Sequence, residues 1–345
     1  MEGYNKKVIM SYWTICRMKT TKKIYVKVSI IFLLGGILLF SSCEKEENQK
    51  IEANRKTLFM YLPWSSNLTN YFYNNISDLE KCITKIGLNN EKVIVFISTG
   101  STEAMMFEIV SSHGRCKREI LKKYKSPPFT TIDGITAILN DVKAFAPASV
   151  YTMIIGCHGM GWLPVYEMKV RSAPHMKMHW EYQGVPLTRY FGGLTAEYQT
   201  DIKSLASGIA NAGMKMEYIL FDDCYMSSIE VAYELKDVTK YLIGSTSEMM
   251  AYGMPYAAIG EYLLGNPDYQ SGCEEFYNFY STYEIMPCGT LAVTDCSELE
   301  NMAAIIKSIN SKYSFDKSLR GTIQRLDGYT PVIFYDFADY ITSLC

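Results

Sequence analysis

The stretch of residues 216–235 constrains the fold of this chain more than any other. Residues 218–221 form a short aromatic and β-branched run of strand length, and the apolar residues after them recur at three- and four-residue spacing. This pattern predicts a buried strand that leads into an amphipathic helix, with Cys224 at the junction. In open α/β sheets, ligands bind at the carboxyl edge of the strands, and a helix N-terminus favours a nearby thiolate. Cys224 is therefore predicted to lie where a nucleophile would be placed.

Strands and helices alternate along the rest of the chain. Strands are predicted at 57–62, 92–98, 105–111, 150–156, 241–245 and 289–294, and helices at 67–86, 132–145, 201–212, 256–264, 273–283 and 299–309. Gly87 is a helix stop signal, Thr130 or Thr131 is a helix cap, and the Pro-Pro pair in 122–128 indicates a loop. This order predicts an α/β fold with a mostly parallel sheet that helices cover on both faces.

Composition places the chain among globular proteins. Its 345 residues are 48% hydrophobic and 20% charged, which suits one large domain or two smaller ones. The formal net charge of -2, without a long basic run in the body of the chain, argues against nucleic acid as the main partner. Eight of the ten cysteines follow Cys43, and none are paired at C-x-x-C spacing. Neither a metal site nor a disulfide framework is therefore predicted.

Residues 1–43 have the features of a bacterial lipoprotein signal peptide. Lysines precede a largely apolar run at 28–40, which at about 13 residues is shorter than the roughly 18 needed to span a bilayer. The run ends in Ser-Ser-Cys, and Cys43 resembles the acylated cysteine of a lipoprotein. An uncleaved anchor helix is the alternative. We expect residues 44–56 to be a polar tether and 57–345 to form the folded domain, held at the cell envelope through the membrane anchor or secreted.

Two predicted strands end in reactive side chains. The strand at 150–156 is followed by His158, and the strand at 218–221 by Cys224, so a parallel sheet would bring both to one edge. A thiol beside a histidine is readily deprotonated, and its thiolate attacks acyl carbons while the histidine later protonates the leaving amine. The backbone N–H groups of Gly159 and Cys224 would form an oxyanion hole. Taken singly, the cysteine is also compatible with a place in the core and the histidine with a structural role.

Residues 151–162 and 221–235 resemble the histidine and cysteine motifs of the clostripain family of cysteine peptidases. In that family a strand leads into His-Gly-x-Gly-Trp, and Asp-x-Cys leads into a Glu-Val-Ala-Tyr-Glu-Leu helix, as in this chain. The resemblance extends over residues 57–339. It implies a caspase-like α/β/α sandwich, a dyad of His158 and Cys224, and hydrolysis of protein or peptide substrates after Arg or Lys.

The resemblance also implies roles for carboxylates near the dyad. Asp222 would form a wall of the pocket for the residue before the scissile bond, because a carboxylate pairs with a guanidinium or ammonium group. Glu248 would face the same pocket, although the methionine-rich segment 249–254 departs from the usual family pattern. Asp223 stands where the family often has a small residue, and we expect it to be a solvated or capping carboxylate at the first turn of the helix.

Residues 163–194 lack a regular period and are predicted to form a long loop. Precursors in the family cut themselves here, so Arg171, Lys177 and Arg189 are candidate cleavage sites. An ordinary basic surface loop is the alternative. No cofactor is expected; some relatives need calcium, but EF-hand spacing is missing and any such site would use scattered carboxylates. The prediction is thus a self-processing cysteine endopeptidase, and the alternative is an inactive envelope binding protein with the same fold.

Overall fold

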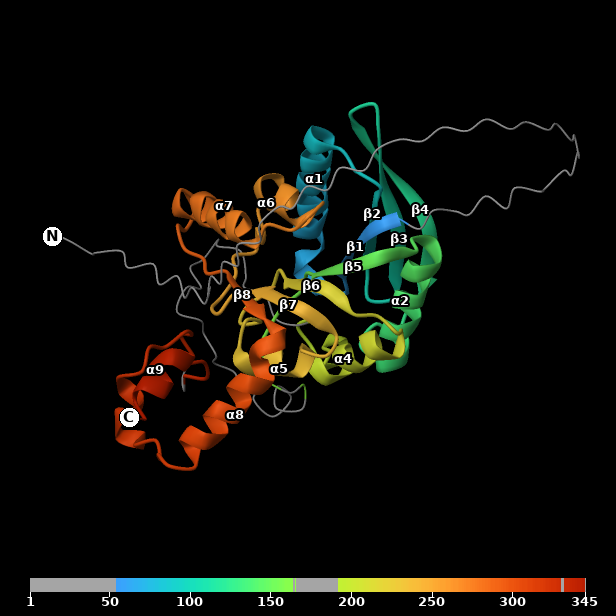
Figure 1. The fold of residues 1–345 in the computed structure, drawn as a ribbon. Helices are drawn as coiled ribbons and strands as arrows, with labels where there is room; N and C mark the ends of the chain where they lie inside the picture. Colours follow the sequence, from blue (N-terminus) through green and yellow to red (C-terminus); the bar gives the residue numbers. More distant parts are fainter. Residues whose placement is uncertain (1–53, 164, 166–191, 330–331, 345) are drawn as a thin grey trace, which may run out of the picture. The chain divides into compact units, whose positions relative to one another are not determined.

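A sheet of eight strands lies at the centre of the residues that this computed structural model describes, which are 54–163, 165, 192–329 and 332–344. The strand order is β4-β3-β2-β1-β5-β6-β7-β8 (Figure 1). The strands are β1 (Asn54–Leu62), β2 (Glu91–Ser98), β3 (Glu103–Ser112), β4 (Arg115–Lys125), β5 (Ala148–Ile155), β6 (Met216–Phe221), β7 (Thr239–Gly244) and β8 (Ala292–Asp295). Strands β2, β1, β5, β6 and β7 run parallel, whereas β3, β4 and β8 pair antiparallel at the two sides. The predicted mostly parallel sheet is confirmed.

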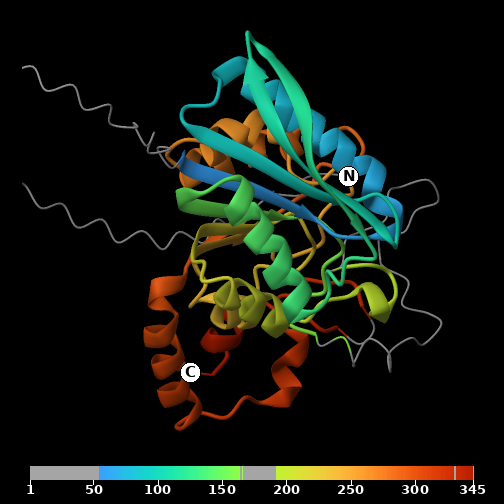
Figure 2. The same ribbon diagram turned by 90° about the vertical axis from the view of Figure 1, so that its right-hand side faces the viewer.

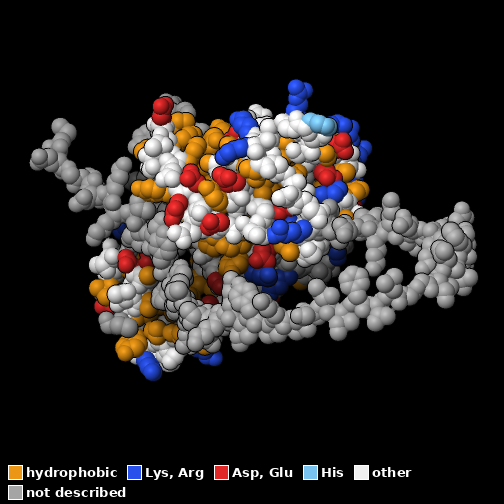
Figure 3. Space-filling view, turned by 45° about the horizontal axis from the view of Figure 1, so that its top comes forward, with side chains coloured by type: hydrophobic (Ala, Val, Ile, Leu, Met, Phe, Trp, Pro, Cys, Tyr) orange, Lys and Arg blue, Asp and Glu red, His pale blue; other side chains and the backbone are white. Residues whose placement is uncertain are grey.

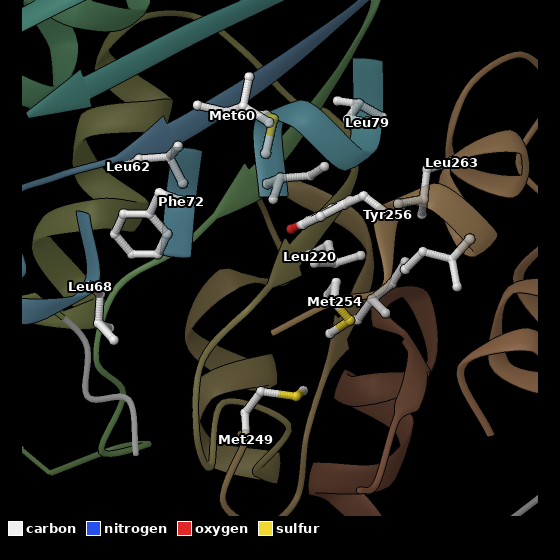
Figure 4. Close-up of a cluster of buried hydrophobic side chains, with 14 of the residues drawn as sticks. Met60, Leu62, Leu68, Phe72, Leu79, Leu220, Met249, Met254, Tyr256 and Leu263 are labelled. Atoms are coloured by element: carbon white, nitrogen blue, oxygen red, sulfur yellow. The ribbon is translucent and has the colours of Figure 1, made fainter. Parts of the chain in front are cut away.

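Helices cover both faces of the sheet (Figures 1 and 2). One face carries α1 (Thr69–Ile86), α6 (Tyr256–Leu263) and α7 (Tyr269–Ser281), and the other carries α2 (Ile132–Phe145), α4 (Ile202–Asn211), α5 (Ile229–Leu235) and α8 (Leu299–Asn310). Because side chains alternate along a strand, Met60 packs in the core on the α1 side and its neighbour Tyr61 in the core on the α2 side. Figure 4 shows the first of these cores, in which Met60 and Leu79 lie near Tyr256. The α/β/α sandwich is confirmed.

Local signals set most of the helix ends as predicted. Thr131 caps α2, since its side chain accepts a hydrogen bond from the Gly134 N–H at 3.1 Å. Gly87 ends α1 with a φ of 77°, in the region that favours glycine. Helix α7 begins at Tyr269, four residues before the predicted start at 273, because Asp268 provides its cap. A short helix, α9 (Phe337–Thr342), follows near the C-terminus.

One strand was not predicted, and another begins earlier than expected. Strand β4 was not predicted, and it reaches Lys125, so the first part of the expected loop at 122–128 is a strand. Its sequence is rich in lysine and arginine because it is an edge strand, where charges discourage pairing with other chains. Strand β1 begins at Asn54, so residues 54–56 belong to the sheet and not to the tether.

Basic and acidic side chains are interspersed on the face shown in Figure 3.

The helix after β6 begins later than predicted. Tyr225 has a φ of 59°, which is incompatible with a right-handed helix, and α5 starts only at Ile229 with Ser228 as its cap. Cys224 therefore lies in a turn five residues before the helix. Because the helix dipole acts within the first turn, the predicted stabilisation of the Cys224 thiolate by α5 is wrong.

Several predictions fall outside the described residues. They are the signal peptide with Cys43, most of the tether and of the 163–194 loop, and the cleavage candidates Arg171, Lys177 and Arg189. Within the described ranges, no helix has the length and hydropathy to cross a bilayer. No disulfide joins the cysteines of this part of the chain.

Candidate active site

The loops that carry His158 and Cys224 lie side by side at the carboxyl edge of the sheet. Strands β5 and β6 are neighbours, and their last paired residues are Ile155 and Phe221. A Cβ placed on Gly159 would lie 2.4 Å from the Cys224 carbonyl oxygen and 3.1 Å from the Cys224 nitrogen. Only glycine allows this approach, so the glycine after the histidine lets the two loops meet.

Asn67 holds the imidazole of His158, which is fully buried. The Asn67 Oδ1 lies 2.9 Å from His158 Nε2, and since an amide oxygen only accepts, this contact is a hydrogen bond when Nε2 carries a proton. The His158 backbone N–H donates to the Gly192 carbonyl at 3.1 Å. Asn67 was not among the predicted site residues, and it comes from the 3₁₀ turn at Ser66–Leu68 between β1 and α1.

The Cys224 thiol is also fully buried, and the segment after β7 lies against it. The Met249 N–H donates to Cys224 Sγ at 3.1 Å, and the Met249 carbonyl oxygen is 3.6 Å from the same sulfur. The Tyr225 N–H donates to the Ser247 carbonyl at 3.0 Å, which joins the two segments. The backbone of Met249 thus contacts the sulfur through both its N–H and its carbonyl oxygen.

Asp222 and Glu248 lie on the two segments that meet at Cys224. Asp222 is buried, and its carboxylate accepts from the Met254 N–H at 2.9 Å and from the Tyr256 hydroxyl at 3.0 Å. Glu248 is half-buried, and its carboxylate oxygens face inward. Burial, and next the charge of Glu248, raises the pKa of Tyr225. The carboxylates of Asp222 and Glu248 therefore both lie on segments next to the Cys224 thiol.

Asp223 differs from the expected solvated or capping carboxylate. It has no exposed surface, and its Oδ1 accepts the Cys157 backbone N–H at 2.6 Å. The expectation was wrong because the turn after β6 is not helical, so the side chain reaches the end of β5 instead of a helix terminus.

The aromatic side chains of Tyr329 and Phe334, near the C-terminus, pack on both loops. The Phe334 ring stacks on Tyr225 with centroids 4.4 Å apart, and a Cβ on Gly161 would lie 2.7 Å from the Phe334 ring. The Tyr329 hydroxyl donates to the Met160 sulfur at 3.1 Å. These aromatic residues were also missed, since nothing in their local sequence indicates a partner so distant along the chain.

Comparison with known proteins identifies the family. The sequence model described as the clostripain family matches residues 60–343 of the chain. The chain belongs to the clostripain family of cysteine peptidases. A search of curated proteins finds no match.

Solved structures of clostripain-family peptidases share the fold. A secreted C11 cysteine protease from Bacteroides thetaiotaomicron, called iotapain, is 60% identical, with a TM-score of 0.78 over 85% of this chain and 81% of that one. An inactive zymogen of a C11 protease from Parabacteroides distasonis is 24% identical, with a TM-score of 0.69 over 84% and 77%. A secreted C11 cysteine protease from Bacteroides thetaiotaomicron in complex with an irreversible peptide inhibitor is 20% identical, with a TM-score of 0.66 over 84% and 78%. The caspase-like fold and the assignment as a cysteine peptidase are thereby confirmed.

Metal binding was the remaining question for this clostripain-family chain. In the described ranges, no three His, Cys, Asp or Glu side chains gather into a group that could hold a metal ion. No residue there is therefore assigned to calcium.

Proposed function

We propose that this clostripain-family peptidase is an endopeptidase in which Cys224 is the nucleophile and His158 the general base and acid. The observation that carries the proposal is the contact of Gly159 with the Cys224 backbone, which aligns the loops of the two residues. The Asn67 amide supports it, because its oxygen lies within hydrogen-bond distance of the His158 imidazole and orients the ring.

The reaction would follow the acyl-transfer scheme of a thiol peptidase. His158 takes the Cys224 proton, and the thiolate attacks the scissile carbonyl carbon to form a tetrahedral oxyanion. The N–H groups of Gly159 and Cys224 would bind this oxyanion. His158 then protonates the leaving amine, and water that it deprotonates hydrolyses the thioester and releases the free thiol.

The proposed preference is for Arg or Lys before the scissile bond. Glu248 and Asp222 are the acidic side chains of the segments that meet at the thiol, so a cationic substrate side chain would find its counter-charge there. Asp222 already accepts two hydrogen bonds, from Met254 and Tyr256, and would share its charge with them. The preference is expected to depend on both carboxylates, Asp222 and Glu248.

Self-processing and attachment to the cell envelope are also part of the proposal. The candidate cuts after Arg171, Lys177 or Arg189 fall between β5 and α4, so His158 and Cys224 would end on separate chains that the β5–β6 ladder holds together. Acylation of Cys43 would anchor the peptidase to a membrane. The relative iotapain is described as secreted, which agrees with export from the cytoplasm.

The decisive experiment measures cleavage of fluorogenic peptides that end in Arg, Lys, Ala or Glu. Wild type should cleave the Arg and Lys peptides, and Cys224→Ala should cleave none; equal turnover by both proteins would refute the nucleophile. Covalent labelling by a Lys-bearing peptide electrophile should also require Cys224. Burial raises the pKa of the Cys82, Cys273 and Cys296 thiols to about 11, so they should stay unlabelled at neutral pH.

The same proteins test self-processing and anchoring. Wild type should give two bands on a denaturing gel and Cys224→Ala one, whereas two bands from both would assign the cut to another protease. Cys43→Ser should release the protein from the membrane fraction of the producing bacterium, and unchanged fractionation would contradict a lipid anchor.

A further inference from the structure

Asp223 contacts the residues on both sides of His158. Its Oδ1 accepts the Cys157 backbone N–H at 2.6 Å, and its Oδ2 lies 3.5 Å from Cys157 Sγ. A Cβ placed on Gly159 would lie 2.8 Å from the Asp223 Cβ. Because Cys224 is the next residue along the chain, this one side chain joins the loop after β5 to the loop after β6.

The contact begins where the sheet stops connecting the two strands. The last backbone bond between them runs from the Asp222 N–H to the Ile155 carbonyl at 2.8 Å. The hydrogen bond from the Cys157 N–H to the Asp223 carboxylate lies further along the two chain segments, and here a side chain replaces the backbone as the acceptor. Asp223 and Cys157 both have no exposed surface, so water does not compete for the bond.

We propose that Asp223 is a positioning residue of this peptidase. It acts through the backbone of Cys157 and Gly159 to keep the His158 imidazole at its working distance from the Cys224 thiol. The inference rests on the proposed dyad of Cys224 and His158. If Asp223 only stabilised the fold, its substitution would not lower kcat specifically, because the β5–β6 ladder already joins these strands.

The geometry makes a specific demand on residue 223. The side chain must place one acceptor oxygen on the Cys157 N–H, and its Cβ must leave room for Gly159. Asparagine has the same length and an acceptor oxygen, serine is one bond shorter, and alanine has no acceptor. The expected order of catalytic competence is Asp and Asn first, then Ser, then Ala.

The test compares Asp223→Asn, Asp223→Ser and Asp223→Ala with wild type on a fluorogenic peptide that ends in Lys. Misplacement of a catalytic group by about 1 Å costs on the order of 100-fold in rate, so Asp223→Ala should lose about that factor in kcat with KM within about threefold. Asp223→Asn should keep at least about a third of the wild-type kcat, and Asp223→Ser should fall between. Each kcat is normalised to the folded fraction from near-ultraviolet circular dichroism at 15 °C.

A matched control is Asp295→Ala. Asp295 is an aspartate that also accepts a backbone N–H, that of Ser297 at 2.9 Å, but it lies at the end of β8. Its substitution should leave kcat unchanged, so a loss of kcat in Asp223→Ala alone would not be a general effect of removing an aspartate that accepts a backbone N–H.

The outcomes separate this inference from the proposed function. Rescue by Asn, with kcat loss in Ala at constant KM, supports the inference. The inference is overturned if Asp223→Ala keeps kcat within threefold of wild type, or if the loss appears in KM. It is also overturned if Asp223→Asn is as slow as Asp223→Ala, or if neither Asp223→Ala nor Asp223→Ser folds at 15 °C. A wild type that neither cleaves the peptide nor is labelled at Cys224 would instead refute the proposed dyad.

Discussion

The ring of Phe334 lies on the ring of Tyr225 with centroids 4.4 Å apart and planes 6° from parallel. Tyr225 follows Cys224 directly and holds a φ of 59°, a conformation that non-glycine residues seldom adopt without support from their surroundings. Phe334 therefore supports the turn that carries Cys224, the proposed nucleophile.

Substituting Phe334 should weaken both the fold and the reaction. Phe334→Ala removes a buried ring and should lower the free energy of unfolding by about 3 kcal/mol. It should also lower kcat, since the turn at Tyr225 loses its support, and Phe334→Leu should recover part of both. Urea titration and peptide cleavage measure the two effects. Phe315→Ala, which removes a ring that lies tilted against Tyr340, should leave kcat intact; an equal loss in both variants would contradict a specific role for Phe334.

Substituting Gly159 should slow cleavage strongly and leave most of the fold intact. In Gly159→Ala the new methyl would overlap the Cys224 carbonyl oxygen, 2.4 Å away, so the two loops must separate. A displacement of about 1 Å predicts a loss on the order of 100-fold in kcat/KM. Gly272→Ala is the control, because its Cβ meets only Tyr262 at an ordinary 3.5 Å; it should keep full activity and gain up to about 1 kcal/mol as a helical alanine. Full activity of Gly159→Ala would refute the predicted close approach.

Asn67 should tune the pH dependence of cleavage. In Asn67→Asp a carboxylate would accept from His158 Nε2, which favours the imidazolium and raises the pKa of His158. The acidic limb of the kcat/KM profile should then move to higher pH by about one unit or more. In Asn67→Ala the His158 imidazole loses the hydrogen bond that orients it, so kcat should fall while the acidic limb stays at its wild-type pH. A limb that stays in place in Asn67→Asp would show that the contact does not act on the catalytic base.

Lys56 should make the free energy of unfolding increase with pH between about pH 8 and 10.5. Burial lowers the pKa of Lys56 from 10.5 to about 8, although the nearby Glu91 acts in the opposite direction. Between these values the unfolded chain binds more protons than the folded one, so the contribution of Lys56 to stability is lowest below pH 8 and rises with pH up to 10.5. Relative to Lys56→Met, wild type should gain about 2 to 3 kcal/mol across this window. Urea titrations at pH 7 to 10 measure the difference, and the exposed Lys312→Met should track wild type throughout.

The alternation of strands and helices was readable in the sequence because the central strands are buried on both faces. Such strands are continuous apolar runs, and those before His158 and Cys224 stood out from their polar surroundings. Strand β4 was not readable, since its charged residues are those of an exposed edge and resemble a loop. The start of α5 was misplaced because spacing alone does not reveal a positive φ at Tyr225.

The site was predictable only where its chemistry is local to one motif. His158, Gly159 and Cys224 are distinctive within a few residues of sequence. Asn67 reaches His158 across 91 residues of sequence, and Phe334 lies 109 residues after its partner Tyr225 (334 minus 225); no periodicity encodes such contacts. Asp223 was misread because a turn residue gives no signal of the direction in which its side chain faces.

The complete burial of Cys224 and His158 has a kinetic consequence. A reagent can meet the sulfur only while the surrounding segments are transiently open, so alkylation should approach a ceiling rate at high reagent concentration, set by the frequency of opening. Peroxide meets the same limit, because oxidation also requires access to the thiolate. Closure would thus shield the sulfur from oxidation between substrates, and a variant that opens more often would lose its activity sooner in the presence of peroxide.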